Sequence, residues 1–202
     1  MPKGMIHDLD GMLISGTRFS AAYVEEFDID PAPMWEFFEG PYKECILGRA
    51  DLKEELAKGW LPKWKWRGSL DELLAYWWKQ GATLNSELVG AIRTVRTAGV
   101  RCFVATNQEK YRAAFLKTTF DLENLFDKVF VSSELGCKKP EPAFFDRVME
   151  LLDQDQVIQP KDIMFWDDRP DYVEGARAYG FQAFLFIDTK GYLEEVHQQG
   201  IL

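Results

Sequence analysis

The stretch that decides the fold is Gly4-Met5-Ile6-His7-Asp8-Leu9-Asp10-Gly11, near the start of a chain of 202 residues. Its mostly apolar first part predicts a short strand over residues 4–9, which ends at a turn-favouring Asp-Gly pair. Asp8 and Asp10 are two positions apart, so they point the same way from an extended strand, whereas His7 faces the other side. Two carboxylates are therefore expected together where this strand ends.

After about residue 85 the sequence predicts alternating strands and helices. We expect strands over 100–105, 128–131, 163–166 and 182–186, and helices over 86–97, 109–118, 142–152 and 172–179, with Ser86 as an N-cap. Such alternation favours a parallel sheet covered by helices on both faces. The apolar run Cys102-Phe103-Val104-Ala105 fits a strand that is buried on both sides. The fold class predicted is α/β, with a Rossmann-like parallel sheet as its core.

Residues 15–84 differ from the rest of the chain in composition and in hydrophobic periodicity. They contain six of the seven tryptophans, which are Trp35, Trp60, Trp64, Trp66, Trp77 and Trp78. Apolar residues recur at helical spacing, as in Leu70, Leu73, Leu74 and Trp77. We therefore predict a small helical module inserted after the first strand, its core filled by the tryptophans. The segment 60–67 interleaves aromatic and basic residues, and packing is the favoured interpretation over nucleic-acid stacking or contact with a substrate's leaving group.

Three further polar clusters follow apolar runs, namely Thr106-Asn107, Lys139-Pro140 and Asp167-Asp168. In an open parallel sheet, ligands bind beyond the carboxyl ends of the strands. The clusters should therefore meet Asp8 and Asp10 at one crevice. Carboxylates, a hydroxyl, an amide and an ammonium together suit a magnesium ion and a phosphate group.

The four clusters, in this order and at this approximate spacing, resemble the motifs of the haloacid dehalogenase-like (HAD) hydrolase superfamily. The resemblance covers nearly the whole chain and is closest to phosphatase-type members with a helical cap inserted after the first motif. It implies a core domain made of residues 1–14 and 85–202 and a cap domain of residues 15–84.

The chemistry of the residues and the resemblance assign roles to the site. Asp8 is the expected nucleophile, because a carboxylate can form an aspartyl-phosphate intermediate, and Asp10 the expected acid and base. Substrate phosphate is expected to bind Thr106, Asn107 and Lys139. The resemblance implies Mg²⁺ as cofactor, held by the Asp8 carboxylate, the Asp10 backbone carbonyl and the Asp168 carboxylate, with Asp167 as a further ligand, a residue behind the ligands or merely a neighbour.

Asp10 favours phosphate monoester hydrolysis, because dehalogenase members carry a different residue there. A phosphomutase, a 2-haloacid dehalogenase and a non-catalytic binding module on the same scaffold stay open as alternatives. The receiver domains of bacterial signalling fit poorly, since their phosphorylated aspartate lies in mid-chain. Lys139 is preferred to Lys138 because the family lysine directly precedes a proline. His7 is expected to face the core, and Arg169 either alters charge near the metal or pairs with a surface carboxylate.

Composition limits the partners. The formal net charge of −9 disfavours non-specific contact with nucleic acid or an anionic membrane. Three scattered cysteines, no apparent signal peptide and no long apolar stretch favour a cytoplasmic protein with reduced thiols. The expected partner is a small phosphorylated metabolite, with neither nucleic acid nor membrane, and the expected state is a monomer or homodimer.

Overall fold

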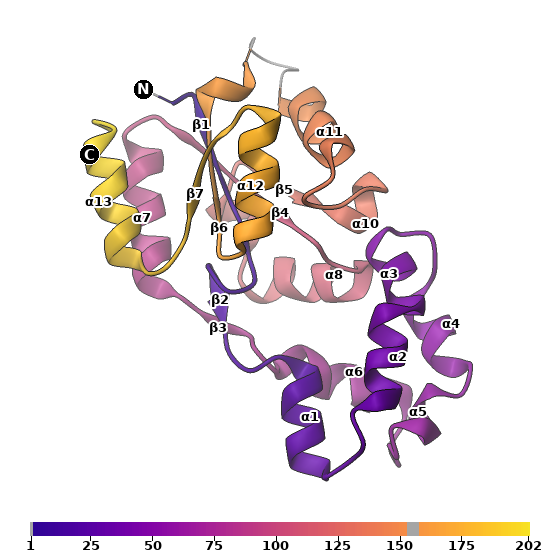
Figure 1. Ribbon diagram of the computed structural model, residues 1–202. Coiled ribbons are helices and arrows are strands. Elements are labelled where there is room, and N and C mark those ends of the chain that lie inside the picture. Colours follow the sequence, from indigo (N-terminus) through magenta and orange to yellow (C-terminus); the bar gives the residue numbers. More distant parts are fainter. Residues whose placement is uncertain (1, 153–157) are drawn as a thin grey trace.

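In the computed structural model, which describes residues 2–152 and 158–202, five parallel strands form one sheet in the order β5-β4-β1-β6-β7 (Figure 1). The strands are β1 (Gly4–His7), β4 (Arg101–Thr106), β5 (Lys128–Val131), β6 (Ile163–Asp167) and β7 (Gln182–Leu185). β1 lies at the centre and pairs with β4 and β6, so that His7 is in register with Val104 and Trp166. The α/β fold class predicted from the sequence is confirmed.

Helices cover both faces of the sheet (Figure 1). On one face are α7 (Ser86–Thr97), α8 (Lys110–Thr119) and α13 (Thr189–Gln198), whose apolar residues pack on alternate strand residues such as Met5, Cys102 and Met164. On the other face are α11 (Pro142–Leu152) and α12 (Pro170–Tyr179), which pack on the intervening strand residues. Burial on both faces explains why β4 and β6 are almost continuously apolar.

Short elements complete this part of the chain: α9 (Leu122–Leu125), α10 (Ser132–Leu135) and the 3₁₀ turn Pro160–Asp162. The sequence expectations hold closely for β5 and α11, whereas α13 was not expected. The N-cap of α7 is also a correction, because it is Asn85 rather than Ser86. The Asn85 side chain accepts a hydrogen bond from the backbone of Leu88 at 3.1 Å. Asparagine and serine cap helices equally well, so composition alone could not separate them.

Between residues 15 and 84 the chain is mostly helical. Its helices are α1 (Phe19–Phe27), α2 (Ala32–Glu39), α3 (Pro41–Ile46), α4 (Leu52–Ala57), α5 (Trp60–Lys63) and α6 (Leu70–Lys79). The chain leaves and re-enters the sheet part through an antiparallel pair of two-residue strands, β2 (Ile14–Ser15) and β3 (Thr83–Leu84). In Figure 1 these helices lie beyond the end of the sheet at which β1 leads into β2.

The six helices have a hydrophobic cluster of their own, in which Tyr23, Phe37 and Trp64 are fully buried. The predicted packing role is confirmed for Trp60, Trp64 and Trp77, which are buried in this cluster. It is wrong for Trp35, whose side chain is 55% exposed. Helical spacing identifies the face of a helix but not whether that face meets a neighbour, and Trp35 of α2 lies outside this cluster.

Candidate active site

Asp8 and Asp10 follow β1 and line one pocket of about 600 Å³, together with Thr106, Asn107 and Asp168. The chain turns at Gly11, whose positive φ of 87° is a conformation that favours glycine. A side chain at Gly11 would also collide with the Asp168 carboxylate. The turn that follows β1 therefore lies directly against Asp168, the residue after β6. The pocket lies at the carboxyl ends of the parallel strands, where the sequence placed it.

Lys139 is buried at the base of this site. Its side chain is 0% exposed, and Nζ donates to Oδ1 of Asp8 at 2.5 Å and to Oδ2 of Asp167 at 2.6 Å. The neighbouring Lys138 lines the pocket instead. The structure thus places Lys139, the lysine chosen from the sequence, against the first aspartate.

The pKa values of this group reflect burial and pairing. Burial raises the pKa of Asp8 to about 8, although the Lys139 ammonium acts in the opposite direction. Burial alone would lower the pKa of Lys139, but the Asp8 and Asp167 carboxylates hold it above its ordinary value. Lys139 therefore stays charged, and a further cation beside Asp8 would favour the ionised carboxylate.

Asp8, Asp167 and Asp168 each bring a carboxylate oxygen within 4.8 Å of the others. Two like charges 4 Å apart repel by about 4 kcal/mol at an effective dielectric constant of 20, so one ammonium does not compensate three carboxylates. The Asp167 carboxylate already accepts two hydrogen bonds, one from Lys139 Nζ and one from the backbone N–H of Arg169 at 3.0 Å. Asp8 and the half-buried Asp168 remain as hard oxygen donors facing the pocket. This donor set fits Mg²⁺, which commonly uses one or two carboxylates plus substrate phosphate.

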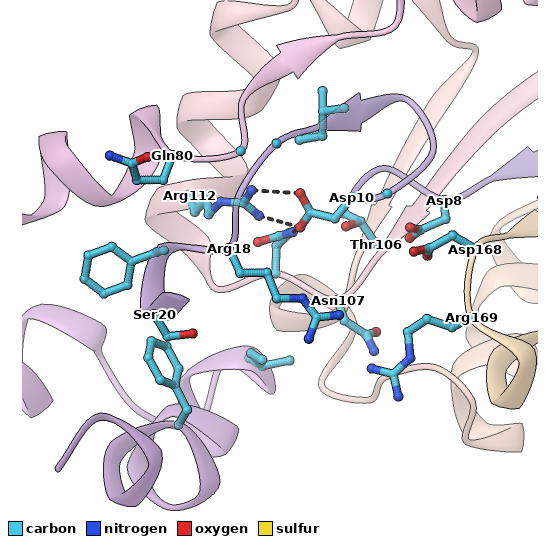
Figure 2. Close-up of a pocket in the computed structure, with 18 of the residues that line it drawn as sticks. Asp8, Asp10, Arg18, Ser20, Gln80, Thr106, Asn107, Arg112, Asp168 and Arg169 are labelled. Carbon is cyan, nitrogen blue, oxygen red and sulfur yellow. Dashed lines mark hydrogen bonds and ion pairs between the residues drawn. The ribbon is translucent and has the colours of Figure 1, made fainter. Parts of the chain in front are cut away.

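Asp10 is held by two residues that the sequence analysis missed. Arg112 forms a bidentate ion pair with it, at 2.6 and 2.7 Å (Figure 2). The Gln108 side-chain amide donates to the same carboxylate. Arg112 lies in the first turn of α8, which Glu109 caps by accepting two backbone N–H groups. The position of Gln108 just after β4 was a usable signal. Arg112 carried none, because it is 102 residues from its partner.

Thr106 is the last residue of β4, one residue beyond the predicted end of the strand, and Asn107 follows it; both line the pocket. Thr106 is buried. The Asn107 side chain donates to the Lys139 carbonyl at 3.0 Å and to the Tyr172 hydroxyl at 3.1 Å, and it accepts the Lys139 N–H at 2.9 Å. Its amide thus holds the loop that carries Lys139, and the phosphate contact expected for Asn107 stays a prediction.

His7 points away from the pocket. Its Nδ1 is 3.1 Å from the Phe103 carbonyl, so it is the donor, and Nε2 then accepts from the Tyr192 hydroxyl at 3.1 Å. Burial lowers the pKa of His7 to about 4, so the ring is neutral. Arg169 pairs with the exposed Asp171 at 2.8 Å, one of the two alternatives considered for it.

The fold and this site together define a parallel α/β protein whose strand ends carry a lysine-bridged group of carboxylates. The chain belongs to the haloacid dehalogenase-like hydrolase family, whose family model matches residues 2–180. It is 32% identical over 102 residues to Phosphatase MT3486 of Mycobacterium tuberculosis (strain CDC 1551 / Oshkosh), a match that covers 50% of this chain and 45% of that protein. It is 40% identical over 111 residues to Drimenol cyclase drtB of Aspergillus calidoustus, covering 54% of this chain and 20% of that protein. The chain therefore matches less than half the length of either relative.

Solved structures show the same fold at low sequence identity. The HAD family enzyme bt-2542 of Bacteroides thetaiotaomicron superposes with a TM-score of 0.81 at 20% identity, covering 96% of this chain and 98% of that one. The same enzyme has been crystallised with magnesium and inorganic phosphate (TM-score 0.76, 20% identity, 92% of this chain and 94% of that one). L-2-haloacid dehalogenase of Xanthobacter autotrophicus has a TM-score of 0.66 at 18% identity and covers 100% of this chain and 85% of that one.

Proposed function

We propose that this protein hydrolyses a small organic phosphate monoester, with Mg²⁺ as cofactor, through an aspartyl-phosphate intermediate. The observation that carries the proposal is the contact of the buried Lys139 with Asp8, beside Asp168 and Thr106 in one pocket. Phosphoryl transfer depends mainly on positioning and charge stabilisation, and this pocket concentrates charged groups around one carboxylate.

In the proposed reaction, an oxygen of Asp8 attacks phosphorus and the bond from phosphorus to the leaving oxygen breaks. Asp10, in its protonated form, gives its proton to that oxygen. It later takes a proton from a water molecule, whose oxygen bonds to phosphorus as the bond from phosphorus to Asp8 breaks and phosphate leaves. Arg112 and Gln108 fix the position of the Asp10 carboxyl group through the contacts described above. Thr106 and Lys139 donate hydrogen bonds to the oxygens of the phosphoryl group, and Asn107 acts by holding the Lys139 loop.

The proposed holders of Mg²⁺ are the carboxylates of Asp8 and Asp168 and the backbone carbonyl of Asp10. When bound, the ion would neutralise charge on the phosphoryl oxygens. Asp167 is proposed as a positioning residue, because its carboxylate accepts from Lys139 and from the Arg169 N–H.

We also propose that residues 15–84 act as a cap over a core made of residues 1–14 and 85–202. The pocket supports this division, because Asp8 and Asp168 come from the sheet side while Arg18, Trp35 and Tyr42 come from the inserted helices. Closure of such a cap would exclude water and select the substrate. In such a cap, the residues of the inserted helices would select the organic group of the substrate.

The proposed partner is a small phosphorylated metabolite and the proposed location is the cytoplasm. Cys45, Cys102 and Cys137 are free and buried, as suits a reducing compartment. In the described part of the chain no helix is both long and apolar enough to cross a bilayer. A monomer or homodimer stays the predicted state.

The test is phosphate release by the purified protein from a panel of phosphate monoesters, with Mg²⁺ and with EDTA. We expect release with Mg²⁺ and at least a 10³-fold lower rate for Asp8→Asn, on the order of the loss of a nucleophile. Asp71→Asn, an exposed carboxylate of α6, is the matched control and should keep full activity. Thermal unfolding should show that Asp8→Asn remains folded. Turnover by Asp8→Asn would exclude the covalent route, and an inactive panel would favour a binding module.

A 2-haloacid dehalogenase is the second candidate, because the Xanthobacter autotrophicus enzyme shares the fold. Halide release from 2-chloropropionate would favour it. Asp10 argues against it, since a halide leaves without needing a proton. Isomerisation of a sugar phosphate without phosphate release would instead indicate a phosphomutase.

A further inference from the structure

The wall of the pocket opposite the strand ends is aromatic. Phe19, Trp35, Phe38, Tyr42 and Trp77, all from the inserted helices, line it. Trp35 is notable because its indole is 55% exposed while its neighbours are buried or half-buried. This wall suits an apolar or planar organic group on the substrate.

Four cations line the pocket, namely Arg18, Arg112, Lys138 and Arg169, and two of them form ion pairs. Arg112 is paired with Asp10, and Arg169 with Asp171. Among the residues that the structure describes, the Arg18 guanidinium and the Lys138 ammonium have no ion pair and no hydrogen bond, and of these two only Arg18 comes from the inserted segment, beside the aromatic wall. It is an unpaired cation in a pocket that also contains three carboxylates.

Arg18 occupies the N-cap position of α1, directly before Phe19 of the aromatic wall. In Figure 2 its side chain extends from the helical side of the pocket toward Asn107, while Asp8 and Asp168 lie on the sheet side. A substrate whose phosphate lies at Asp8 and Lys139 would thus extend its organic part along the aromatic wall toward Arg18.

We propose that Arg18 binds a second anionic group on the substrate, a carboxylate or a second phosphate, separated from the reacting phosphate by an apolar part. This inference rests on the proposed phosphatase function. A second anion would be repelled by Asp10 and Asp168 unless a cation faced it, and the protein carries a net charge of −9. A guanidinium suits this task because its planar donors match carboxylate and phosphate oxygens in pairs.

The experiment compares the kcat/KM of phosphate release for matched aryl phosphates with Mg²⁺ present. Phenyl phosphate has no second anion, 3- and 4-carboxyphenyl phosphate add a carboxylate, and 1,4-phenylene bisphosphate adds a phosphate. The variants are Arg18→Met, Arg18→Lys and the control Arg67→Met. Arg67 is an exposed arginine of the same inserted segment, and it does not line the pocket. Arg67→Met therefore removes the same charge as Arg18→Met without changing the pocket.

We expect the wild-type protein to prefer a doubly anionic substrate over phenyl phosphate. Arg18→Met should reduce this preference roughly 10- to 100-fold, the loss expected for a hydrogen-bonded charge pair, and mainly through KM. Arg18→Lys should retain part of the preference, and Arg67→Met should retain all of it. Whichever has the higher kcat/KM, a carboxyphenyl phosphate or the bisphosphate, shows whether the second anion is a carboxylate or a phosphate.

Two results would overturn the inference alone: phosphate release without any preference for a second anion, or a preference that survives Arg18→Met. Absence of release from every compound would overturn the proposed function and the inference together.

Discussion

Lys139 is a buried ammonium between two carboxylates, Asp8 and Asp167. Such a group is held in place by mutual pairing, because each charge alone would be costly to bury. Next to it, Asn107 accepts the Lys139 N–H and donates to the Lys139 carbonyl. At the scale of single residues, then, the site is built around the position of one lysine.

Replacing this lysine should destabilise the protein as well as inactivate it. Lys139→Met leaves two buried carboxylates without their cation, and we expect the free energy of unfolding to fall by about 3–5 kcal/mol in urea denaturation with EDTA. Lys139→Met combined with Asp167→Asn should recover part of that loss, since one uncompensated charge is removed. The control Lys190→Met changes an 84% exposed lysine and should shift the value by less than about 0.5 kcal/mol. A negligible cost for Lys139→Met would contradict the pairing.

Sequence patterns identified some of these residues and missed others. Asp8, Asp168 and Lys139 follow strands or precede a proline, and each was found from that local signal. Arg112 pairs with a residue 102 positions away, and no local pattern marks such a contact. Asn107 was found, but whether its amide meets a ligand or a loop depends on where the Lys139 segment lies.

At the scale of elements, α12 supports the same loop. Gly175 is in the middle of α12, and a β-carbon there would lie 2.6 Å from Cβ of Pro140 and 3.0 Å from its carbonyl oxygen. The absence of a side chain lets the segment that carries Lys139 approach the helix. The packing of one helix therefore contributes to the position of Lys139.

Gly175→Ala should consequently cost stability, about 1–3 kcal/mol, because an added methyl group overpacks a close contact. It should also lower kcat, since Lys139 would be displaced. Gly90→Ala is the matched control: it lies in α7 with open space around it, and should stabilise the protein by about 0.5–1 kcal/mol. Urea denaturation and phosphate release measure both effects. If the two substitutions behaved alike, the contact with Pro140 would be unimportant.

The first and last residues of helices and strands were predictable where local sequence signals were strong. α11 begins at Pro142, a residue that suits the first turn of a helix. α13 was not expected, because it contains Gly191 and buries only Thr189, Tyr192 and Val196. Its position is set by packing on α7 and the sheet rather than by a clear apolar stripe.

At the scale of the molecule, Asp51 joins the inserted helices to the sheet part. It caps α4 by accepting from two backbone N–H groups, and it also contacts Lys110 at 2.6 Å and the Tyr111 hydroxyl at 2.7 Å, both in α8. Burial alone would raise the pKa of Asp51, but these donors hold it below its ordinary value. Because the pKa is lower in the folded state, the contribution is complete above about pH 4 and is lost as pH falls further.

Asp51→Ala should therefore reduce the free energy of unfolding by about 1–2 kcal/mol at pH 7, the cost of a lost helix cap. The difference between wild type and variant should shrink as pH falls below about 4, as urea denaturation over a pH series would show. Asp71→Ala, at an 83% exposed position, should give only a small difference at pH 7. A wild-type–variant difference that stayed constant from pH 7 to pH 3 would refute the linkage.

The sequence alone determined the alternation of strands and helices, the insertion after the first strand, the presence of Asp8, Thr106 and Asp168 at strand ends, and the choice of Lys139 before Pro140. These properties depend on local periodicity and turn chemistry, and parallel strands bring their ends together in any such sheet. Only the tertiary structure decided that Arg112 holds Asp10, that Asn107 holds the Lys139 loop and that Trp35 lines the pocket instead of the core of the inserted helices. Those contacts depend on how separate helices pack against one another, which no single segment encodes.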